Sequence, residues 1–438
     1  MKRIFSQFAY SDAPRQGCWW DTTVEIGRNP TLHGDITCDV VIVGAGFTGL
    51  SAAYHLARSG ASVVVLEANA VGWGASGRNG GFCCLGGGKA SDGTLDKRVG
   101  RAGRLEWRQA EKAAVALVDA LLSELCLEVD RHSTGETCLA HRPKDARGFE
   151  RDAATVEENY GVTPELLTAG QLKAAGLAGP FHGAMTVPIG FALNPRKFVA
   201  GLYAAARDLG VRFFDQSAVT GIDKAGVSTP LGRVFSDRIL IATNGYSSED
   251  LPDWMAGRYL PTQSSVLVTR PLTAGELSAQ GWTSTQMAYD TRHLLHYFRL
   301  MPDNRFLFGM RGGVFSSPRA EARAQTRLVQ DFRRMFPAWA AVDIPHAWSG
   351  MVCLARGLVP FAGAVTGAPN VLAGFAYHGN GVAMGTFTGK VLAQLALGQT
   401  PDLYPAVMRH PAQKFPLGPL RRSIIPPVYA ALRLDDML

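Results

Sequence analysis

A glycine-spaced turn near the N-terminus constrains the fold of this chain more than any other feature. An apolar, β-branched run at 38–43 leads into the sequence Gly44-Ala45-Gly46-Phe47-Thr48-Gly49, and a segment of helical character follows it. A second apolar run, 63–66, ends at Glu67. Strand, glycine turn, helix, strand and acid within about 30 residues form the pattern of a βαβ unit that binds a dinucleotide. The pattern predicts a Rossmann-type pocket for the ADP half of such a ligand.

Each residue of this motif has an expected task. Gly44 permits the tight turn, Gly46 lets the backbone approach a pyrophosphate, and Gly49 lets the helix pack close to the strand. The phosphates are expected at the free N–H groups of the helix N-terminus, where the helix dipole favours negative charge. Glu67 is expected to hold the ribose hydroxyls. The alternative is an ordinary strand–helix turn without a ligand, and the complete context of the motif argues against it.

A second glycine turn lies near the C-terminus. The apolar run 370–375 leads into His378-Gly379-Asn380-Gly381, and a helix is expected from Val382 to about residue 397. One phosphate site needs only one such turn, so the second indicates a ligand with a second electron-rich region. A flavin fits this requirement, because its reduction places negative charge on the ring, where a helix N-terminus would stabilise it. A plain strand–helix turn is again the alternative.

The composition excludes several other classes of protein. The chain has 438 residues, of which 47% are hydrophobic and 18% are charged, as in a folded protein of two or three domains. The net charge of +7 is dispersed, so no nucleic-acid partner is expected. No apolar run is long enough to span a membrane. The tail, with Arg421-Arg422 followed by the apolar stretch 424–429, could make a weak peripheral membrane contact.

The cysteines indicate the compartment and argue against a metal. Their number is seven, which is odd, and their spacing includes no CxxC pair and no His/Cys metal motif. This usage is typical of reduced thiols in a cytoplasmic protein without a metal site. The first residues are not followed by the apolar stretch of a signal peptide.

The periodicity predicts further elements. Helices are expected at 97–126, 148–178, 195–209 and 320–336, and strands at 263–270, 293–300 and 305–309. The nucleotide-type elements fall into three separated stretches, and the antiparallel-looking strands lie between them. We therefore expect a FAD-binding domain made of 38–95, 186–262 and 346–408. The substrate domain is expected at 96–185 and 263–345, with a lead-in at 1–37 and a tail at 409–438.

Taken together, these motifs resemble the D-amino-acid-oxidase-like family of FAD-dependent oxidoreductases. The resemblance rests on the two glycine turns, Glu67-Ala68, the loop 74–81 (Gly-Ala-Ser-Gly-Arg-Asn-Gly-Gly) and Ile241–Gly245. Within the family, Trp19-Trp20, Trp348-Ser349-Gly350 and the tail 415–433 are most similar to the gamma-glutamylputrescine oxidase branch. The resemblance implies an α/β fold in which a Rossmann-type, glutathione-reductase-like FAD-binding domain carries an inserted antiparallel-sheet substrate domain.

The resemblance also implies FAD as the cofactor and a set of residues that bind it. These residues are Gly44, Gly46, Phe47, Thr48, Gly49, Glu67, Ala68, Ala75, Ser76, Arg78, Asn79, Gly80, Gly81, Val219, Thr243, Asn244, Gly245, Gly350, Gly379, Asn380, Gly381 and Val382. Some relatives attach FAD through a cysteine in the region of Cys353, and a buried free thiol is the alternative for this residue.

The implied reaction is the oxidation of a C–N bond of an amine or amino acid. A neutral amine gives a hydride to flavin N5, and the imine that forms hydrolyses to an aldehyde or keto product. Oxygen is the expected electron acceptor; a dehydrogenase that serves a membrane quinone chain and a non-catalytic flavin-binding protein are the alternatives. Such chemistry depends on positioning more than on a protein acid or base, in agreement with the lack of a Ser/His/Asp or paired-carboxylate signature.

Substrate-contacting residues are expected on the inserted strands and beside the second glycine turn. The four candidates are Arg311, Arg299, Tyr297 and His378. An arginine would bind a substrate carboxylate in a fork, whereas Asp290 would suit an amine. Arg292 and His296 lie in the same stretch. The alternative for each of these residues is a solvated charge or a core aromatic.

Overall fold

An eight-stranded sheet is built around the N-terminal βαβ unit, and the computed structural model describes residues 1–437. Its strands are β1 Ile36–Val43, β2 Val63–Leu66, β8 Arg212–Phe214, β9 Gly221–Asp223, β10 Gly226–Thr229, β11 Gly232–Ile241, β17 Phe361–Val365 and β18 Ala368–Phe375. The central order is β17-β18-β11-β1-β2-β8, and β9 and β10 extend β11. From β18 to β8 the neighbouring strands run parallel. The predicted Rossmann-type arrangement is therefore present.

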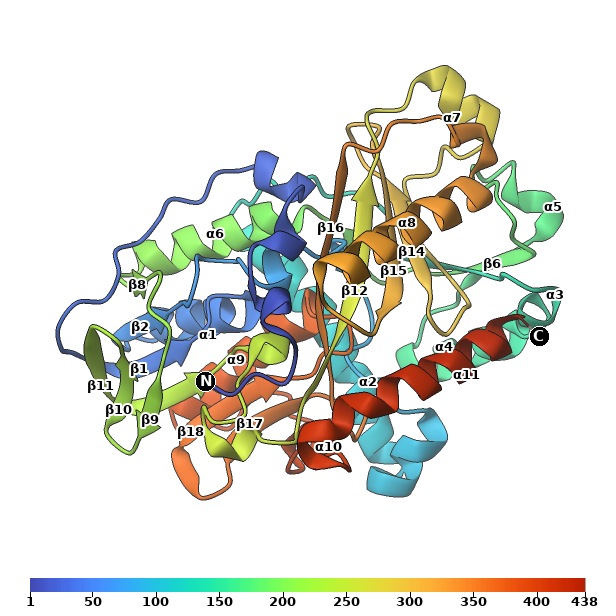
Figure 1. The fold of residues 1–438 in the computed structure, drawn as a ribbon. Coiled ribbons are helices and arrows are strands. Elements are labelled where there is room, and N and C mark those ends of the chain that lie inside the picture. The colour runs from blue at the N-terminus through green and yellow to red at the C-terminus, as the bar shows by residue number, and fades with distance from the viewer. Residues whose placement is uncertain (438) are drawn as a thin grey trace.

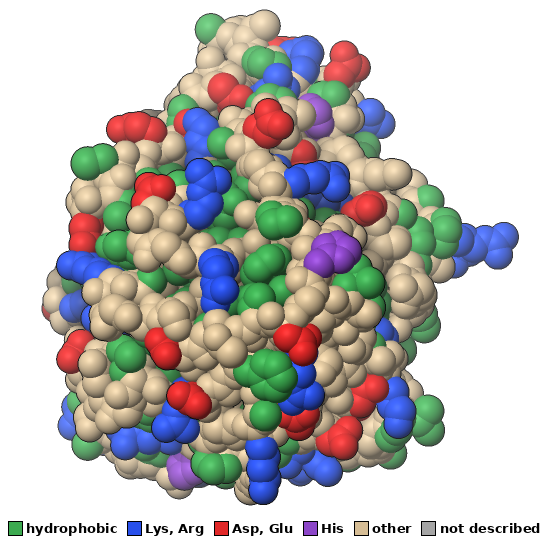
Figure 2. Space-filling view, turned by 90° about the vertical axis from the view of Figure 1, so that its left-hand side faces the viewer, with side chains coloured by type: hydrophobic (Ala, Val, Ile, Leu, Met, Phe, Trp, Pro, Cys, Tyr) green, Lys and Arg blue, Asp and Glu red, His purple; other side chains and the backbone are tan. Residues whose placement is uncertain are grey.

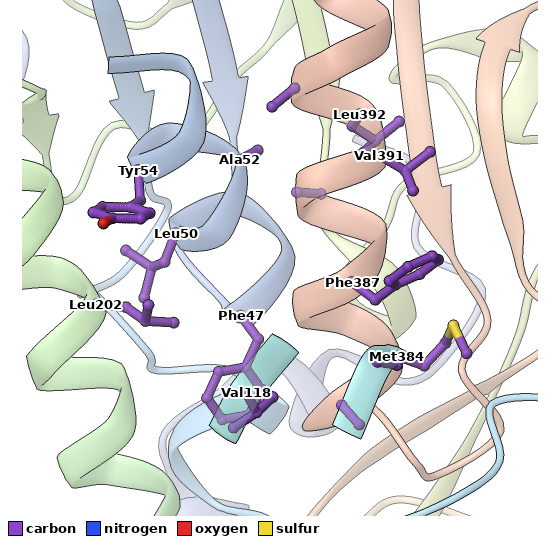
Figure 3. Packing of buried hydrophobic residues seen from close by; sticks show 14 of the residues in the cluster. Phe47, Leu50, Ala52, Tyr54, Val118, Leu202, Met384, Phe387, Val391 and Leu392 are labelled. Carbon is purple, nitrogen blue, oxygen red and sulfur yellow. The ribbon is translucent and has the colours of Figure 1, made fainter. Parts of the chain in front are cut away.

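Three helices form the main core on this sheet. They are α1 Phe47–Arg58, α6 Pro195–Asp208 and α9 Ala383–Ala396. Figure 3 shows α1 between the other two, with Leu50 facing Leu202 of α6. The helices α1 and α9 approach closely because α9 carries Gly389, where an added Cβ would lie 2.4 Å from the Thr48 carbonyl oxygen. The first glycine turn and the second are thereby held in one rigid unit.

A second eight-stranded sheet occupies the other half of the molecule (Figure 1). Its strands, in spatial order, are β16 His346–Leu354, β12 Leu260–Val268, β15 Phe306–Gly313, β14 His296–Leu300, β13 Met287–Asp290, β4 Glu136–Leu139, β6 Gly183–Val187 and β5 Glu165–Thr168. All neighbours are antiparallel except β13 and β4. One face packs on α8 Pro318–Met335 through an aromatic core that includes Phe298, Phe306, Phe308 and Phe332.

The remaining elements connect and cover the two sheets. The helices are α2 Asp92–Glu124, α3 Pro143–Ala146, α4 Phe149–Tyr160, α5 Ala169–Leu172, α7 Ala274–Gln280, α10 Ala406–Arg409 and α11 Ile425–Met437. A short antiparallel pair joins β3 Phe82–Cys83 to β7 Phe191–Ala192.

The predicted fold class is confirmed, with local differences. The helix predicted at 148–178 ends at Tyr160, because Gly161 adopts a left-handed φ of 66° and closes α4. The chain then forms β5 and the short α5. Two elements also lie across the predicted domain boundaries: β16 pairs with β12 in the second sheet, and α2 packs into the core of the first.

The tail does not present the charges on which the membrane contact was predicted. Arg421 is fully buried, forms an ion pair with Glu249 and donates a hydrogen bond to the Tyr259 carbonyl. Arg422 donates to the carbonyls of Pro261 and Val314. Both guanidiniums are thus engaged with groups inside the protein, and the weak peripheral membrane contact stays a prediction. Over residues 1–437, no helix combines the length and apolar character needed to cross a membrane.

The sequence predicts that the positive charges are dispersed and do not form a basic stripe. On the face shown in Figure 2, lysine and arginine side chains are mixed with aspartate and glutamate and do not gather into a stripe. This distribution gives no sign of a nucleic-acid track on that face.

Candidate active site

One cavity of about 360 Å³ is lined by residues of both sheets. From the first sheet, the lining residues follow β1, β2 and β11, where parallel strands end. From the second sheet, they come from β4, β12, β13, β14, β15 and β16. The residues predicted to bind FAD that border this cavity are Gly44, Gly46, Phe47, Thr48, Glu67, Ala68, Ala75, Ser76, Arg78, Asn79, Gly80, Val219, Thr243, Asn244, Gly350, Gly379, Asn380, Gly381 and Val382.

The first glycine turn has the predicted geometry. Gly44 adopts a φ of 105°, and an added Cβ on Gly49 would lie 1.9 Å from the Gly44 carbonyl oxygen. Gly49 therefore serves the close contact of helix and strand and does not border the cavity. An added Cβ on Gly46 would lie 2.8 Å from Ser76 Oγ. The Phe47 N–H donates to the same Ser76 oxygen at 2.9 Å, so the N-terminus of α1 opens toward the cavity beside this hydroxyl.

Glu67 ties the end of β2 to the glycine turn. Its carboxylate accepts hydrogen bonds from the Ala45 N–H at 2.9 Å and the Asn69 N–H at 3.0 Å. Burial raises the pKa of Glu67, while these two donors act in the opposite direction. The side chain is thus held in the cavity wall at the place predicted for the ribose.

The loop 74–81 is held from behind by two tryptophans. Trp20 Nε1 donates to the Asn79 carbonyl at 2.8 Å, and Trp348 Nε1 donates to the Arg78 carbonyl at 2.7 Å. The Arg78 side chain is only 2% exposed and donates to the carbonyls of Trp73 and Ser349. Burial lowers its pKa. Across residues 1–437 no carboxylate forms an ion pair with Arg78, so it places an uncompensated positive charge at the cavity wall.

The second glycine turn is fixed by a neutral histidine. The Ala355 N–H donates to His378 Nε2 at 3.2 Å, so Nδ1 carries the proton and donates to the Gly87 carbonyl at 3.0 Å. Burial lowers the pKa of His378 to about 4. Asn380 Nδ2 donates to the Leu85 carbonyl at 2.6 Å. The N–H groups of Gly381 and Val382 precede the first hydrogen bond of α9 and lie at the cavity.

Two of the four substrate-contacting candidates, Arg311 and Tyr297, border the cavity. Arg311 packs against the second glycine turn, since an added Cβ on Gly379 would lie 2.3 Å from its Nη2 atom. Tyr297 Oη lies 2.9 Å from Ser264 Oγ. Within residues 1–437, the Arg311 guanidinium has neither a hydrogen-bond acceptor nor an ion-pair partner. It is therefore available to a ligand.

The other two candidates do not face the cavity. Arg299 is 1% exposed, donates to the Leu193 carbonyl at 2.8 Å and lies 3.0 Å from His132 Nε2. Burial lowers its pKa to about 9. Arg299 and His378 thus support the walls and are placed to position other residues rather than to touch a substrate. Gly81 and Gly245, predicted to bind FAD, also lie outside the cavity lining.

The other charged residues considered on the inserted strands form a separate network. Asp290 is fully buried, lies 2.8 Å from His296 Nδ1 and forms an ion pair with Arg292. None of these three residues borders the cavity. Cys353 does border it, and burial raises the pKa of this thiol to about 12. A protonated thiol is a weak nucleophile, which favours the free-thiol alternative.

Lys89, Glu136 and Tyr289 are among the cavity-wall residues that the sequence reasoning missed. Lys89 follows the loop 84–88, Glu136 begins β4 and Tyr289 lies in β13. Residues 135–139, Gly-Glu-Thr-Cys-Leu, show no alternation of polar and apolar side chains that would have marked Glu136 as lying on one face of a strand. Within residues 1–437, no group of His, Cys, Asp or Glu has the arrangement of a metal site.

The residues present fit a FAD molecule. Two helix N-termini, of α1 and α9, open on the same cavity, and Arg78, which has no ion-pair partner among residues 1–437, also borders it. A Cβ at Gly46 would approach Ser76 Oγ to 2.8 Å and one at Gly379 would approach Arg311 Nη2 to 2.3 Å, so at both turns a glycine lets cavity-wall side chains lie close to the backbone. This donor set suits a ligand with a pyrophosphate and a second electron-rich region.

Comparisons with known proteins agree with the geometry. A family model described as FAD dependent oxidoreductase matches residues 39–395. The chain is 30% identical over 396 residues to gamma-glutamylputrescine oxidoreductase of Escherichia coli (strain K12), covering 89% of this chain and 90% of the relative. It is also 30% identical over 398 residues to the probable oxidoreductase OrdL of Rhizobium meliloti (strain 1021), covering 88% and 89%.

Solved structures share the fold at lower identity. Iminodiacetate oxidase from Chelativorans sp. BNC1 superposes with a TM-score of 0.70 at 20% identity, over 84% of this chain and 98% of that one. Glycine oxidase from Geobacillus kaustophilus superposes with a TM-score of 0.69 at 18% identity, over 86% and 98%. The chain therefore belongs to the DAO family of FAD-dependent oxidoreductases, enzymes that act on CH–NH donors.

Proposed function

We propose that this enzyme oxidises the C–N bond of a primary or secondary amine that also carries a carboxylate some bonds away. The observation that carries the proposal is the Arg311 guanidinium, which faces the cavity beside Gly379 and has no partner among residues 1–437. The name of the Escherichia coli relative specifies gamma-glutamylputrescine, which has this combination of groups. This compound is the first substrate to test.

The cavity walls supply binding and orientation. When bound, FAD supplies the acceptor for two electrons and for the hydride that leaves the carbon next to the amine. The N-terminus of α1 and Arg78 would hold the pyrophosphate, and the N-terminus of α9 would favour negative charge at the second electron-rich region. Arg311 orients the substrate carboxylate, and Tyr297, kept in place by Ser264, forms the adjoining wall. Water then hydrolyses the released imine.

The test is anaerobic mixing of the purified, FAD-loaded enzyme with gamma-glutamylputrescine. We expect the visible flavin bands to bleach, and a simple uncharged amine to bleach them more slowly. A flavoprotein that no acidic amine reduces would contradict the proposal and favour the non-catalytic alternative.

We propose oxygen as the electron acceptor and the cytoplasm as the location. All seven cysteines are free thiols, which suits a reducing compartment. A quinone-linked dehydrogenase is the second candidate, because Leu417, Leu420, Val428 and Leu434 of the tail are exposed and apolar. Oxygen uptake with the substrate supports an oxidase, whereas reduction of a quinone-like dye without oxygen uptake supports a dehydrogenase.

A further inference from the structure

The cavity-facing side of the second sheet carries charges at two opposite corners. In the strand order β15-β14-β13-β4, Gly309, Tyr297, Tyr289 and Cys138 lie in one row. Arg311 lies two residues from that row in one direction along β15. Glu136 lies two residues from it in the other direction along β4. The backbone positions of Arg311 and Glu136 are thus diagonal, offset by three strand spacings, about 14 Å, across the sheet and by four residues, about 13 Å, along it. The two tyrosines lie between them, and the side chains of both charged residues border the same cavity.

A second cation faces the same space. Lys89 directly follows the loop 84–88. Its side chain borders the cavity together with Arg311 and Glu136. No two of these three residues form an ion pair with each other, and none pairs with another charge among residues 1–437. Lys89 is exposed, and Glu136 and Arg311 are half-buried. A ligand that fills the cavity would remove these charges from water, which is costly unless the ligand supplies charges of opposite sign. The arrangement is therefore suited to a ligand that brings charges of both signs.

The electrostatics show that the three groups are close enough to interact. Burial raises the pKa of Glu136 to about 7, against the opposing influence of the Cys84 thiol, Lys89 and Arg311. Partial desolvation at the cavity wall lowers the pKa of Lys89 to about 8, Arg311 lowers it further and Glu136 raises it. Lys89 thus interacts electrostatically with both Arg311 and Glu136. A site for a carboxylate, at Lys89 and Arg311, therefore adjoins a site for an ammonium, at Glu136.

We propose that Glu136 binds a second, non-reacting ammonium of the substrate, while Lys89 and Arg311 bind the neighbouring carboxylate. The substrate is then an amine whose far end is an α-amino acid. This inference rests on the proposed function and sharpens its substrate class. Glu136 acts as a specificity-determining residue, since an analogue that lacks the second ammonium leaves its carboxylate unpaired.

The test compares two ligands that differ only in this ammonium: L-glutamine and 4-carbamoylbutanoate. Their dissociation constants for the FAD-loaded enzyme are measured by perturbation of the visible spectrum under anaerobic conditions. Wild type should prefer glutamine by about tenfold, as expected for one charge-assisted hydrogen bond. Glu136→Gln should abolish this preference without weakening the binding of 4-carbamoylbutanoate. Lys89→Gln should weaken the binding of both ligands. Glu128→Gln, a matched change at an exposed residue, should behave as wild type.

Several outcomes would overturn the inference. They are an unchanged preference in Glu136→Gln, an equal loss of both ligands in that variant, or bleaching of the flavin by glutamine, which would make the α-amine the reacting group. If Glu136→Gln does not retain FAD, wild type is measured across pH. The preference should then disappear as Glu136 becomes protonated below about pH 7. A preference that persists unchanged to pH 5.5 would contradict a role for the carboxylate.

A matched pair of amines separates this inference from the proposed function. Gamma-glutamylputrescine and N-(4-aminobutyl)glutaramic acid differ only by the α-ammonium. Failure of both to reduce the flavin contradicts the proposed function. Reduction by both with equal KM contradicts only the ammonium subsite, whereas a lower KM for gamma-glutamylputrescine that Glu136→Gln removes supports it.

Discussion

The hydroxyl of Thr48, in the first turn of α1, lies 2.8 Å from the hydroxyl of Tyr377, at the start of the second glycine turn. This contact joins residues 329 positions apart, and it links the two turns whose helices open on one cavity. Ser51 Oγ reinforces the link one turn further on by donating to the Thr386 carbonyl at 2.7 Å. The spacing of the two helix N-termini is therefore set by hydrogen bonds inside the protein, before any ligand binds.

Tyr377→Phe should weaken both the fold and FAD binding. Tyr377 is 4% exposed, so loss of its hydroxyl leaves Thr48 without this partner and lowers the free energy of unfolding by about 1 kcal/mol. Because the link sets the spacing of the turns, FAD should also dissociate more readily. The control is Tyr203→Phe, whose hydroxyl bonds to Asn29 Oδ1 away from the cavity. Urea unfolding and FAD titration should show a stability loss in both variants but weaker FAD binding only in Tyr377→Phe.

Gly46→Val should abolish FAD binding while leaving a folded apoprotein. The new Cβ would approach Ser76 Oγ to 2.8 Å, and the branched side chain would enter the space between α1 and the loop 74–81. Gly27→Val is the control, since an added Cβ there meets nothing within 4 Å. Visible absorbance after incubation with excess FAD should be lost only in Gly46→Val. Normal flavin loading of this variant would mean that the pyrophosphate does not lie at α1.

The sequence predicted the cofactor half of the cavity better than the substrate half, for a physical reason. Gly44, Gly46 and Glu67 lie within one βαβ unit, where local spacing alone fixes the geometry. Glu136 reaches the cavity because β4 pairs with β13, a strand about 150 residues further along the chain. No local pattern encodes that pairing.

The errors have a similar origin. The stretch 148–178 contains enough apolar residues to suggest one long helix, yet Gly161 ends α4 and the following residues add an edge strand to the second sheet. Arg299 looked like a substrate anchor because its strand is correctly placed. Its side chain points instead to the Leu193 carbonyl, which the alternation of a strand cannot reveal without knowledge of its partners.

Arg311→Ala should lower kcat/KM for gamma-glutamylputrescine by about 10- to 100-fold, as expected for loss of one charge-assisted anchor. Turnover of a small uncharged amine should change little, because Arg311 has no structural partner among residues 1–437. Arg319→Ala, at an exposed position near the start of α8, is the charge-matched control and should leave both activities intact. Equal losses on the two amines would show that Arg311 supports the fold or the flavin instead.

The stability of the enzyme should fall in mildly acidic solution, in part through His378. Its folded pKa of about 4 lies below the value of about 6.5 for an unfolded histidine, so the unfolded chain binds a proton first as the pH falls. The contribution is fully present above about pH 6.5 and is lost progressively toward pH 4, by up to about 3 kcal/mol. The physical reason is first that burial disfavours the charged ring. Protonation of Nε2 would also abolish its bond from the Ala355 N–H. His55 and His132, with pKa values lowered by burial to about 4 and about 3, should add to the same slope.

His378→Gln isolates the contribution of this residue. Urea unfolding of the FAD-loaded proteins at several pH values between 7 and 4.5 should give a shallower loss of stability in His378→Gln than in wild type. His33→Gln, at an exposed position, should keep the wild-type slope. If the His378→Gln slope equals that of wild type, the neutral histidine does not hold the second glycine turn against the loop at Gly87, and the fixed position of the α9 N-terminus must come from Asn380 and Tyr377 alone.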